Sequence, residues 1–62
     1  MKNQETVIGR TIINTKSNFR NLNGKVVDVV EMVGNRVTCL IFADEHQKYV
    51  KADFSKSECV FL

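Results

Sequence analysis

The sequence is poor in the residue types that most catalytic and metal sites require. Its 62 residues include one histidine, two cysteines, three glycines and no tryptophan. The single histidine, His46, follows two acidic residues in a predicted turn, which is typical of a solvated turn and provides no constellation of base, nucleophile and partner. Three scattered glycines form no phosphate-binding loop. We therefore expect no enzymatic activity, no cofactor and no metal site.

Long hydrophobic runs are also missing. No segment approaches the roughly 20 apolar residues that a membrane-spanning helix needs, and the first residues do not resemble the apolar region of a signal peptide. We therefore expect a cytoplasmic protein that does not contact a membrane. The whole chain, residues 1–62, is predicted to form one domain, with residues 1–5 as a flexible N-terminus.

The composition favours a folded chain with a thin core. Hydrophobic residues make up 44% of the sequence and charged residues 26%, which argues against intrinsic disorder. A chain of this size buries only roughly 60% of its unfolded surface and often needs a disulfide, a metal or a second copy for stability. Cys39 and Cys59 have apolar neighbours, which favours buried reduced thiols. A disulfide is the alternative if the strands that carry them face each other.

Short apolar segments separated by turn residues predict an all-β fold with no long helix. Asn23-Gly24 and Gly34-Asn35 are strong turn signals, and the second fits a two-residue hairpin loop. Residues 15–24 form a long polar loop, in which we expect Phe19 and Leu22 to pack back onto the sheet through one helical turn. Residues 53–58 are predicted to be a turn or a single 3₁₀ helix. The expected strands are residues 7–14, 25–33, 36–42, 47–52 and 59–62.

The predicted strand over residues 25–33 is apolar on both faces. A period of two places Val26, Asp28, Val30 and Met32 on one face, and Val27, Val29 and Val33 on the other. Such a strand either bends strongly, so that its ends contribute to opposite surfaces, or carries a partner interface.

The order of these elements resembles the SH3-like barrel, and we expect a five-stranded SH3-like barrel with a long first loop and a 3₁₀ turn before the last strand. The segments IGRTII (8–13), LNGKVVDV (22–29) and RVTCLIFAD (36–44) are similar to the Tudor-like and KOW-type modules of bacterial transcription and repair proteins. The resemblance covers most of the chain. It implies a partner such as RNA polymerase, ribosomal RNA, duplex DNA or another protein, without choosing among them.

Two activities of related barrels are not expected here. Signalling SH3 domains bind polyproline through a groove of Trp and Tyr, whereas this chain has no Trp and only Tyr49. A methyl-lysine reader needs several convergent aromatic side chains for cation–π contact. The aromatic residues here are scattered along the chain, at Phe19, Phe42, Tyr49, Phe54 and Phe61.

An uneven charge distribution supports nucleic-acid binding as one hypothesis. The net charge is only +2, yet residues 6–27 contain bases and no acid, whereas residues 28–45 are mainly acidic. Bases in the first loop would contact phosphates, and aromatic and amide side chains would stack on bases or hydrogen-bond to them. The candidate residues are Lys16, Phe19, Arg20, Asn21 and Lys25.

The second hypothesis is a protein-interaction module or accessory regulator that docks on a larger protein of transcription, translation or DNA metabolism. The apolar strand 25–33 and its predicted neighbour motivate it, with Val29, Leu40 and Phe42 as candidate interface residues. Pairing at a strand edge would add main-chain affinity. A homodimer is compatible with either hypothesis, because small barrels gain burial by pairing identical surfaces.

Overall fold

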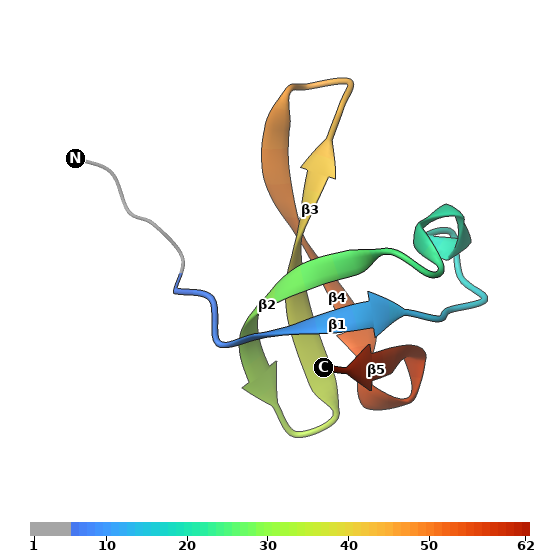
Figure 1. Cartoon of the computed structure of the whole chain (residues 1–62), viewed down its shortest axis with the longest axis vertical. Coiled ribbons are helices and arrows are strands. Elements are labelled where there is room, and N and C mark those ends of the chain that lie inside the picture. The colour runs from blue at the N-terminus through green and yellow to red at the C-terminus, as the bar shows by residue number, and fades with distance from the viewer. Residues whose placement is uncertain (1–5) are drawn as a thin grey trace.

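A computed structural model describes residues 6–62, which form a single antiparallel sheet of five strands in the order β4-β3-β2-β1-β5 (Figure 1). The predicted flexible N-terminus, residues 1–5, lies outside the described residues. Two 3₁₀ turns interrupt the strands, one in the first loop and one before the last strand, as the sequence predicts. The elements are β1 (Gly9–Ile13), η1 (Arg20–Leu22), β2 (Val26–Val33), β3 (Arg36–Ala43), β4 (Lys48–Ser55), η2 (Lys56–Glu58) and β5 (Cys59–Phe61).

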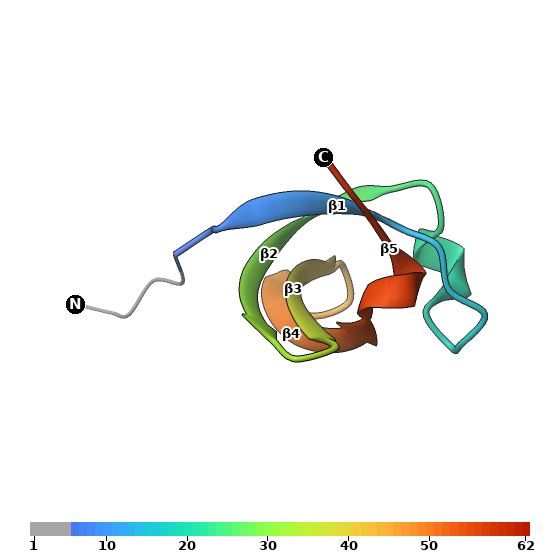
Figure 2. The ribbon, with the colours of Figure 1, turned by 90° about the horizontal axis from the view of Figure 1, so that it is seen from below.

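The sheet curls but does not close. Strands β2, β3 and β4 follow one another around an arc, and η2 brings the chain back toward β1 (Figure 2). Strands β4 and β5 are the two edges of the sheet, and no ladder joins them within residues 6–62. The predicted all-β fold is confirmed, whereas the predicted closure into a barrel is not observed. The short strand β5 pairs with β1, and η2 lies between β4 and β5 in the chain.

The core lies on the concave side of this arc. Every second residue of β3 from Val37 to Ile41 points into it, as the alternation predicts, and Phe54 lies opposite Val37 on β4. Burying each large apolar side chain contributes about 1.5–3 kcal/mol. Leu22, Val27 and Cys59 pack around the buried cluster, which consists of Ile13, Val29, Val37, Cys39, Ile41, Ala52 and Phe54.

A β-bulge in β2 changes the predicted faces of this strand. Val29 lies opposite Cys39, but Glu31 lies opposite Thr38, so the register shifts at Val30. Residues directly opposite each other share a face of the sheet. The face prediction is therefore wrong beyond Val29, because Met32 shares the face of Val37 and Val33 that of Arg36. The extra residue of a bulge also bends the strand, which agrees with the predicted bend.

Strand β4 is longer than predicted, because it runs to Ser55 rather than ending at residue 52. Phe54 fills the core, and the Thr38 hydroxyl donates a hydrogen bond of 2.7 Å to the Asp53 carboxylate across the β3–β4 pair. These tertiary contacts outweigh the turn preference of Asp and Ser.

Candidate binding surface

The basic loop, defined as residues 15–25, is held in place by polar side chains. The Asn23 side chain accepts a hydrogen bond from the Thr15 N–H (2.8 Å) and donates one to the Thr15 carbonyl (2.9 Å). Ile13 N–H donates to the Lys25 carbonyl, and Gly24 N–H to the Ile13 carbonyl, which closes the loop at its base. Asn23 thus acts as a substitute for a strand partner at the point where β1 ends.

Glu58 joins this loop to the C-terminal part of the chain. Its carboxylate accepts a hydrogen bond from the buried Thr15 hydroxyl and two from Ser55, which begins η2 with a capping box. These hydrogen bonds hold the pKa of Glu58 below its usual value. The bond from the Thr15 hydroxyl has the largest effect, and those from the Ser55 N–H and hydroxyl have smaller ones. The loop, η2 and the start of β5 are therefore connected through one carboxylate.

The aromatic residue of the basic loop packs against the core only in part, because Phe19 contacts Phe54 but remains 40% exposed. The rings of Phe19 and Phe54 meet edge to face, with centroids 5.4 Å apart. Leu22 is half-buried against the core, and η1 supplies the predicted helical turn. Only part of the Phe19 ring is therefore available for stacking on a base. Lys16, Asn21 and Lys25 are exposed, and the Arg20 guanidinium donates to the Ser17 carbonyl.

A second surface lies on the convex side of the sheet. Ile12 is opposite Val26 on one side and Val60 on the other, so the three side chains form a row across β2, β1 and β5. Val26 and Val60 are each 52% exposed. The row continues on β3 and β4 with half-buried Leu40 and an aromatic pair. We call this set the outer apolar stripe: Ile12, Val26, Leu40, Phe42, Tyr49 and Val60.

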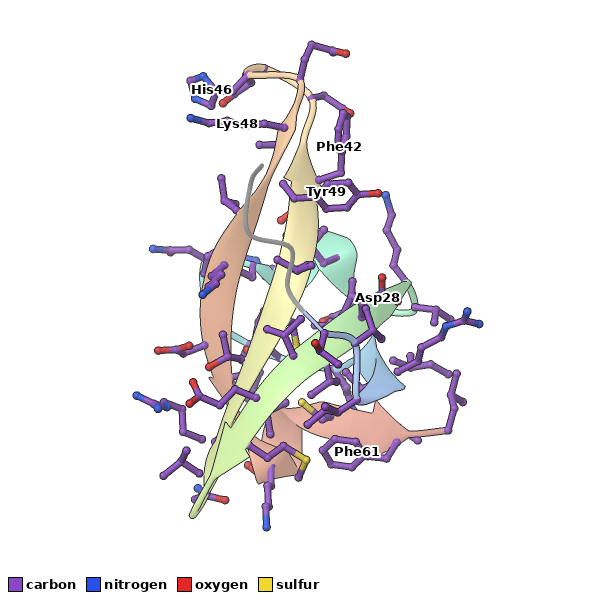
Figure 3. All side chains as sticks on the ribbon, turned by 90° about the vertical axis from the view of Figure 1, so that its left-hand side faces the viewer. Asp28, Phe42, His46, Lys48, Tyr49 and Phe61 are labelled. Atoms are coloured by element: carbon purple, nitrogen blue, oxygen red, sulfur yellow. The ribbon has the colours of Figure 1, made fainter. Side chains whose placement is uncertain are left out.

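The aromatic pair gives the stripe its largest side chains. Phe42 and Tyr49 are opposite each other on the β3–β4 hairpin, and their rings make an edge-to-face contact with centroids 5.1 Å apart. Figure 3 shows both rings on the same side of the hairpin, above Asp28, whereas His46 and Lys48 lie near its tip. Tyr49 is 62% exposed. The pair therefore presents an aromatic surface to solvent.

A groove runs through this surface between the start of β2 and the β3–β4 hairpin. It has a volume of about 330 Å³, and Val26, Leu40, Phe42 and Tyr49 contribute to its wall. Lys25, Asp28 and Asp44 line the same groove. We call it the fork groove, because β2 and β3 separate here.

The structure brings several predicted site residues together but separates others. A second groove, of about 450 Å³, lies between the basic loop and the hairpin and is lined by Phe19, Asn21, Lys25 and Phe42. Lys25 and Phe42 therefore border both grooves. Val29 is only 1% exposed and belongs to the core. The prediction that Val29 lies at an interface is wrong for the folded chain, because its side chain points to the concave side.

Sequence reasoning missed Tyr49, Val26, Ile12 and Val60 as surface residues. The signal that could have found them is the pairing register, because Ile12 joins Val26 through the β1–β2 ladder and Val60 joins Ile12 through the β1–β5 ladder. Tyr49 was recognised as the single tyrosine, but its position opposite Phe42 depends on the length of the 44–47 turn.

The cysteines offer no reactive thiol. Both are free; Cys39 is buried and Cys59 is half-buried. Burial, with smaller contributions from Cys59 and Asp53, raises the pKa of the Cys39 thiol to about 11. Burial also raises the pKa of Cys59. Both thiols are protonated at neutral pH, and thiolate is the nucleophilic form.

Neither the remaining structural features nor comparisons with known proteins assign a function. In residues 6–62, no helix is long and apolar enough to span a bilayer, and no cluster of three or more His, Cys, Asp or Glu side chains is arranged to hold a metal ion. Comparisons of the chain with protein families, curated proteins and solved structures give no match.

Proposed function

We propose that this chain is a non-enzymatic binding module, in the manner of an accessory regulator, that docks on a larger protein through the outer apolar stripe. The resemblance to SH3-like barrels of the Tudor-like and KOW-type kind belongs to the same proposal, and it favours a partner from transcription, translation or DNA metabolism.

The observation that carries the proposal is the exposed aromatic and aliphatic content of the stripe. Aromatic residues are enriched at the centres of protein interfaces, and Phe42 and Tyr49 adjoin Leu40 and Val26 around a groove. Contiguous apolar surface of this kind marks interaction sites more often than it marks bare surface. An enzyme would instead need a positioned nucleophile or base.

A matched pair of valines tests the proposal. Val26 and Val33 stand at opposite ends of β2 and are similarly exposed, at 52% and 54%. Val26→Asp should abolish capture of a stoichiometric partner from a nuclease-treated bacterial lysate, whereas Val33→Asp should retain it. Both variants should keep the wild-type circular dichroism spectrum. Equal capture by both variants would exclude the stripe as the docking surface.

Nucleic-acid binding by the basic loop is the second candidate function. Within residues 6–62, Lys16 and Arg20 have no carboxylate partner in an ion pair, which leaves both cations able to contact phosphates. Against it, Lys25 shares the fork groove with Asp28 and Asp44, and Phe19 is engaged with Phe54. Capture that disappears on nuclease treatment and on Lys16→Glu/Arg20→Glu substitution would favour this candidate.

A further inference from the structure

The fork groove lies where a strand ladder ends early. Strands β2 and β3 pair from Val33↔Arg36 only as far as Asp28↔Leu40. Strand β2 nevertheless continues to Val26, paired with β1, and β3 continues to Ala43, paired with β4. Figure 1 shows β2 running across the sheet while the β3–β4 hairpin extends away from it.

The main-chain groups at this point face the groove. The Lys25 carbonyl accepts a hydrogen bond from Ile13 on β1, and successive residues of an antiparallel strand direct their peptide groups to alternate sides. The N–H and C=O of Val26 therefore point toward β3. The Ala43 carbonyl accepts a hydrogen bond from the His46 N–H in the hairpin turn, so it points toward β4. By the same alternation, the N–H and C=O of Phe42 point toward β2. Val26 and Phe42 are not partners in the ladder.

The charged side chains that line the groove differ in whether they already have an ion-pair partner. Asp28 already has the Arg10 guanidinium at 3.7 Å. Asp44, at the hairpin end of the groove, makes no ion pair with any residue in the range 6–62. Lys25 stands on the β2 side of the same groove. The groove is therefore apolar along Leu40 and Phe42, with an available carboxylate next to Phe42 at its hairpin end.

From this arrangement we infer that the partner contributes an extended peptide segment that adds as a strand to the open edge of β3 at Phe42. The main chain of the segment bonds to the Phe42 peptide group, as in other cases of strand addition. An apolar side chain of the segment lies in the groove opposite Phe42. A Lys or Arg two positions away lies beside Asp44, because side chains two apart share a face of a strand. This inference rests on the proposed docking function and specifies its partner chemistry.

The test uses random 12-residue peptides displayed on phage and selected on the full 62-residue chain. We expect the selected peptides to carry an apolar residue and a Lys or Arg two positions apart. In complex with a selected synthetic peptide, hydrogen exchange at the Phe42 amide should slow at least tenfold by NMR. The same peptide with an N-methyl group at the pairing residue should bind at least tenfold more weakly.

A matched pair of charge reversals tests the position of the basic residue. Asp44→Lys should weaken the selected peptides several-fold and shift a repeated selection toward Asp or Glu. Glu45→Lys makes the same change one residue away, next to His46 and outside the wall of the fork groove. It should leave both affinity and selection unchanged. Equal effects of the two variants would overturn the assignment of the cation to Asp44.

Failure of this inference is distinguishable from failure of the docking proposal. Peptides that bind without protecting the Phe42 amide, or no enrichment over the Val26→Asp variant, would overturn strand addition. A lysate partner that still depends on Val26 would then leave the docking proposal intact. Protection of the same amide by a single-stranded oligonucleotide, or by raising the concentration of the chain alone, would overturn the inference in favour of a nucleic acid or a second copy.

Discussion

The basic loop and the outer apolar stripe differ in how their exposed residues are supported. In the loop, the Asn23 side chain bonds to the Thr15 main chain, and the Thr15 hydroxyl bonds to Glu58 of η2, so a polar segment is tied to the fold by hydrogen bonds. In the stripe, Val26, Phe42 and Tyr49 keep large apolar areas in contact with water. The polar residues of the loop have a structural role, because their hydrogen bonds stabilise the fold. The exposed apolar area of the stripe has no such role in the fold. This difference is why we propose docking through the stripe.

The largest effect is expected at Val29, on the concave face of the strand that carries Val26. Val29→Asp places a carboxylate in the core, at a cost of more than about 4 kcal/mol. After the entropy cost of folding is subtracted, a core of this size leaves a net stability of only about 3–5 kcal/mol. We expect no cooperative thermal transition by circular dichroism, whereas Val26→Asp should melt within a few degrees of wild type. A folded Val29→Asp variant would contradict the division of β2 into a core face and a docking face.

The next largest effect concerns the support of the basic loop. Asn23→Ala removes two hydrogen bonds to the Thr15 main chain and should lower the free energy of unfolding by about 1–2 kcal/mol. Asn21→Ala, in the same loop, is the control, because Asn21 is exposed and makes no side-chain hydrogen bond within residues 6–62. This control should change the stability by less than about 0.5 kcal/mol. Equal urea denaturation curves for the two variants would show that the loop is not held by Asn23.

Acid titration separates the loop from the stripe, because Glu58 supports the loop and the stripe contains no carboxylate. The pKa of Glu58 is lowered in the folded chain, whereas an unfolded Glu titrates near about 4.3. The stability from this carboxylate is therefore complete above about pH 5 and is lost as the pH falls through the lower folded value. Glu58→Gln should be less stable than wild type at pH 7.

The difference between wild type and Glu58→Gln should shrink as the pH falls from 5 to 3, when both are followed by urea denaturation. Glu45→Gln is the control, because Glu45 is exposed and its only ion pair in the described chain is with His46. It should track wild type at every pH. A constant difference between wild type and Glu58→Gln across this range would contradict the assigned shift.

The smallest effect is expected from the loop cations. If docking uses the stripe, Lys16→Glu/Arg20→Glu should change the affinity for the captured protein by less than about twofold, because exposed charges act weakly at physiological salt. Lys48→Glu/Lys56→Glu makes the same charge change outside the loop and serves as the control. A loss of affinity specific to the loop variant, with a flattened salt dependence, would indicate phosphate contacts instead.

The sequence predicted the parts of this fold that depend on local chemistry. The hairpin at Gly34-Asn35 and the alternation of Val37, Cys39 and Ile41 are confirmed. The packing of Phe19 is met in part, because its ring contacts Phe54 and stays 40% exposed. The bulge at Val30 was not predicted, because no residue in a run of valines marks it. The assignment of Val29 to an interface was wrong because an alternation identifies two faces without showing which of them is the interior.

Properties that depend on pairing between distant segments could not be read from the sequence. The row from Val60 to Val26 exists because β5 pairs with β1, and the fork groove exists because one ladder ends at Leu40. Likewise, the extension of β4 depends on Asp53 and Phe54 finding partners on β3. The candidate site was therefore predicted only in part, at Leu40, Phe42 and Lys25.

The hydrogen bond between Thr15 and Glu58 joins residues separated by 43 positions, and this separation has a consequence for the order of folding. Contacts that close long loops form slowly, and Asn14 N–H also bonds to the Glu58 carbonyl. During synthesis, the hairpins of β2, β3 and β4 can therefore form before the first loop acquires its final conformation. We expect a chain that lacks residues 56–62 to retain hairpin structure while its basic residues sample many conformations.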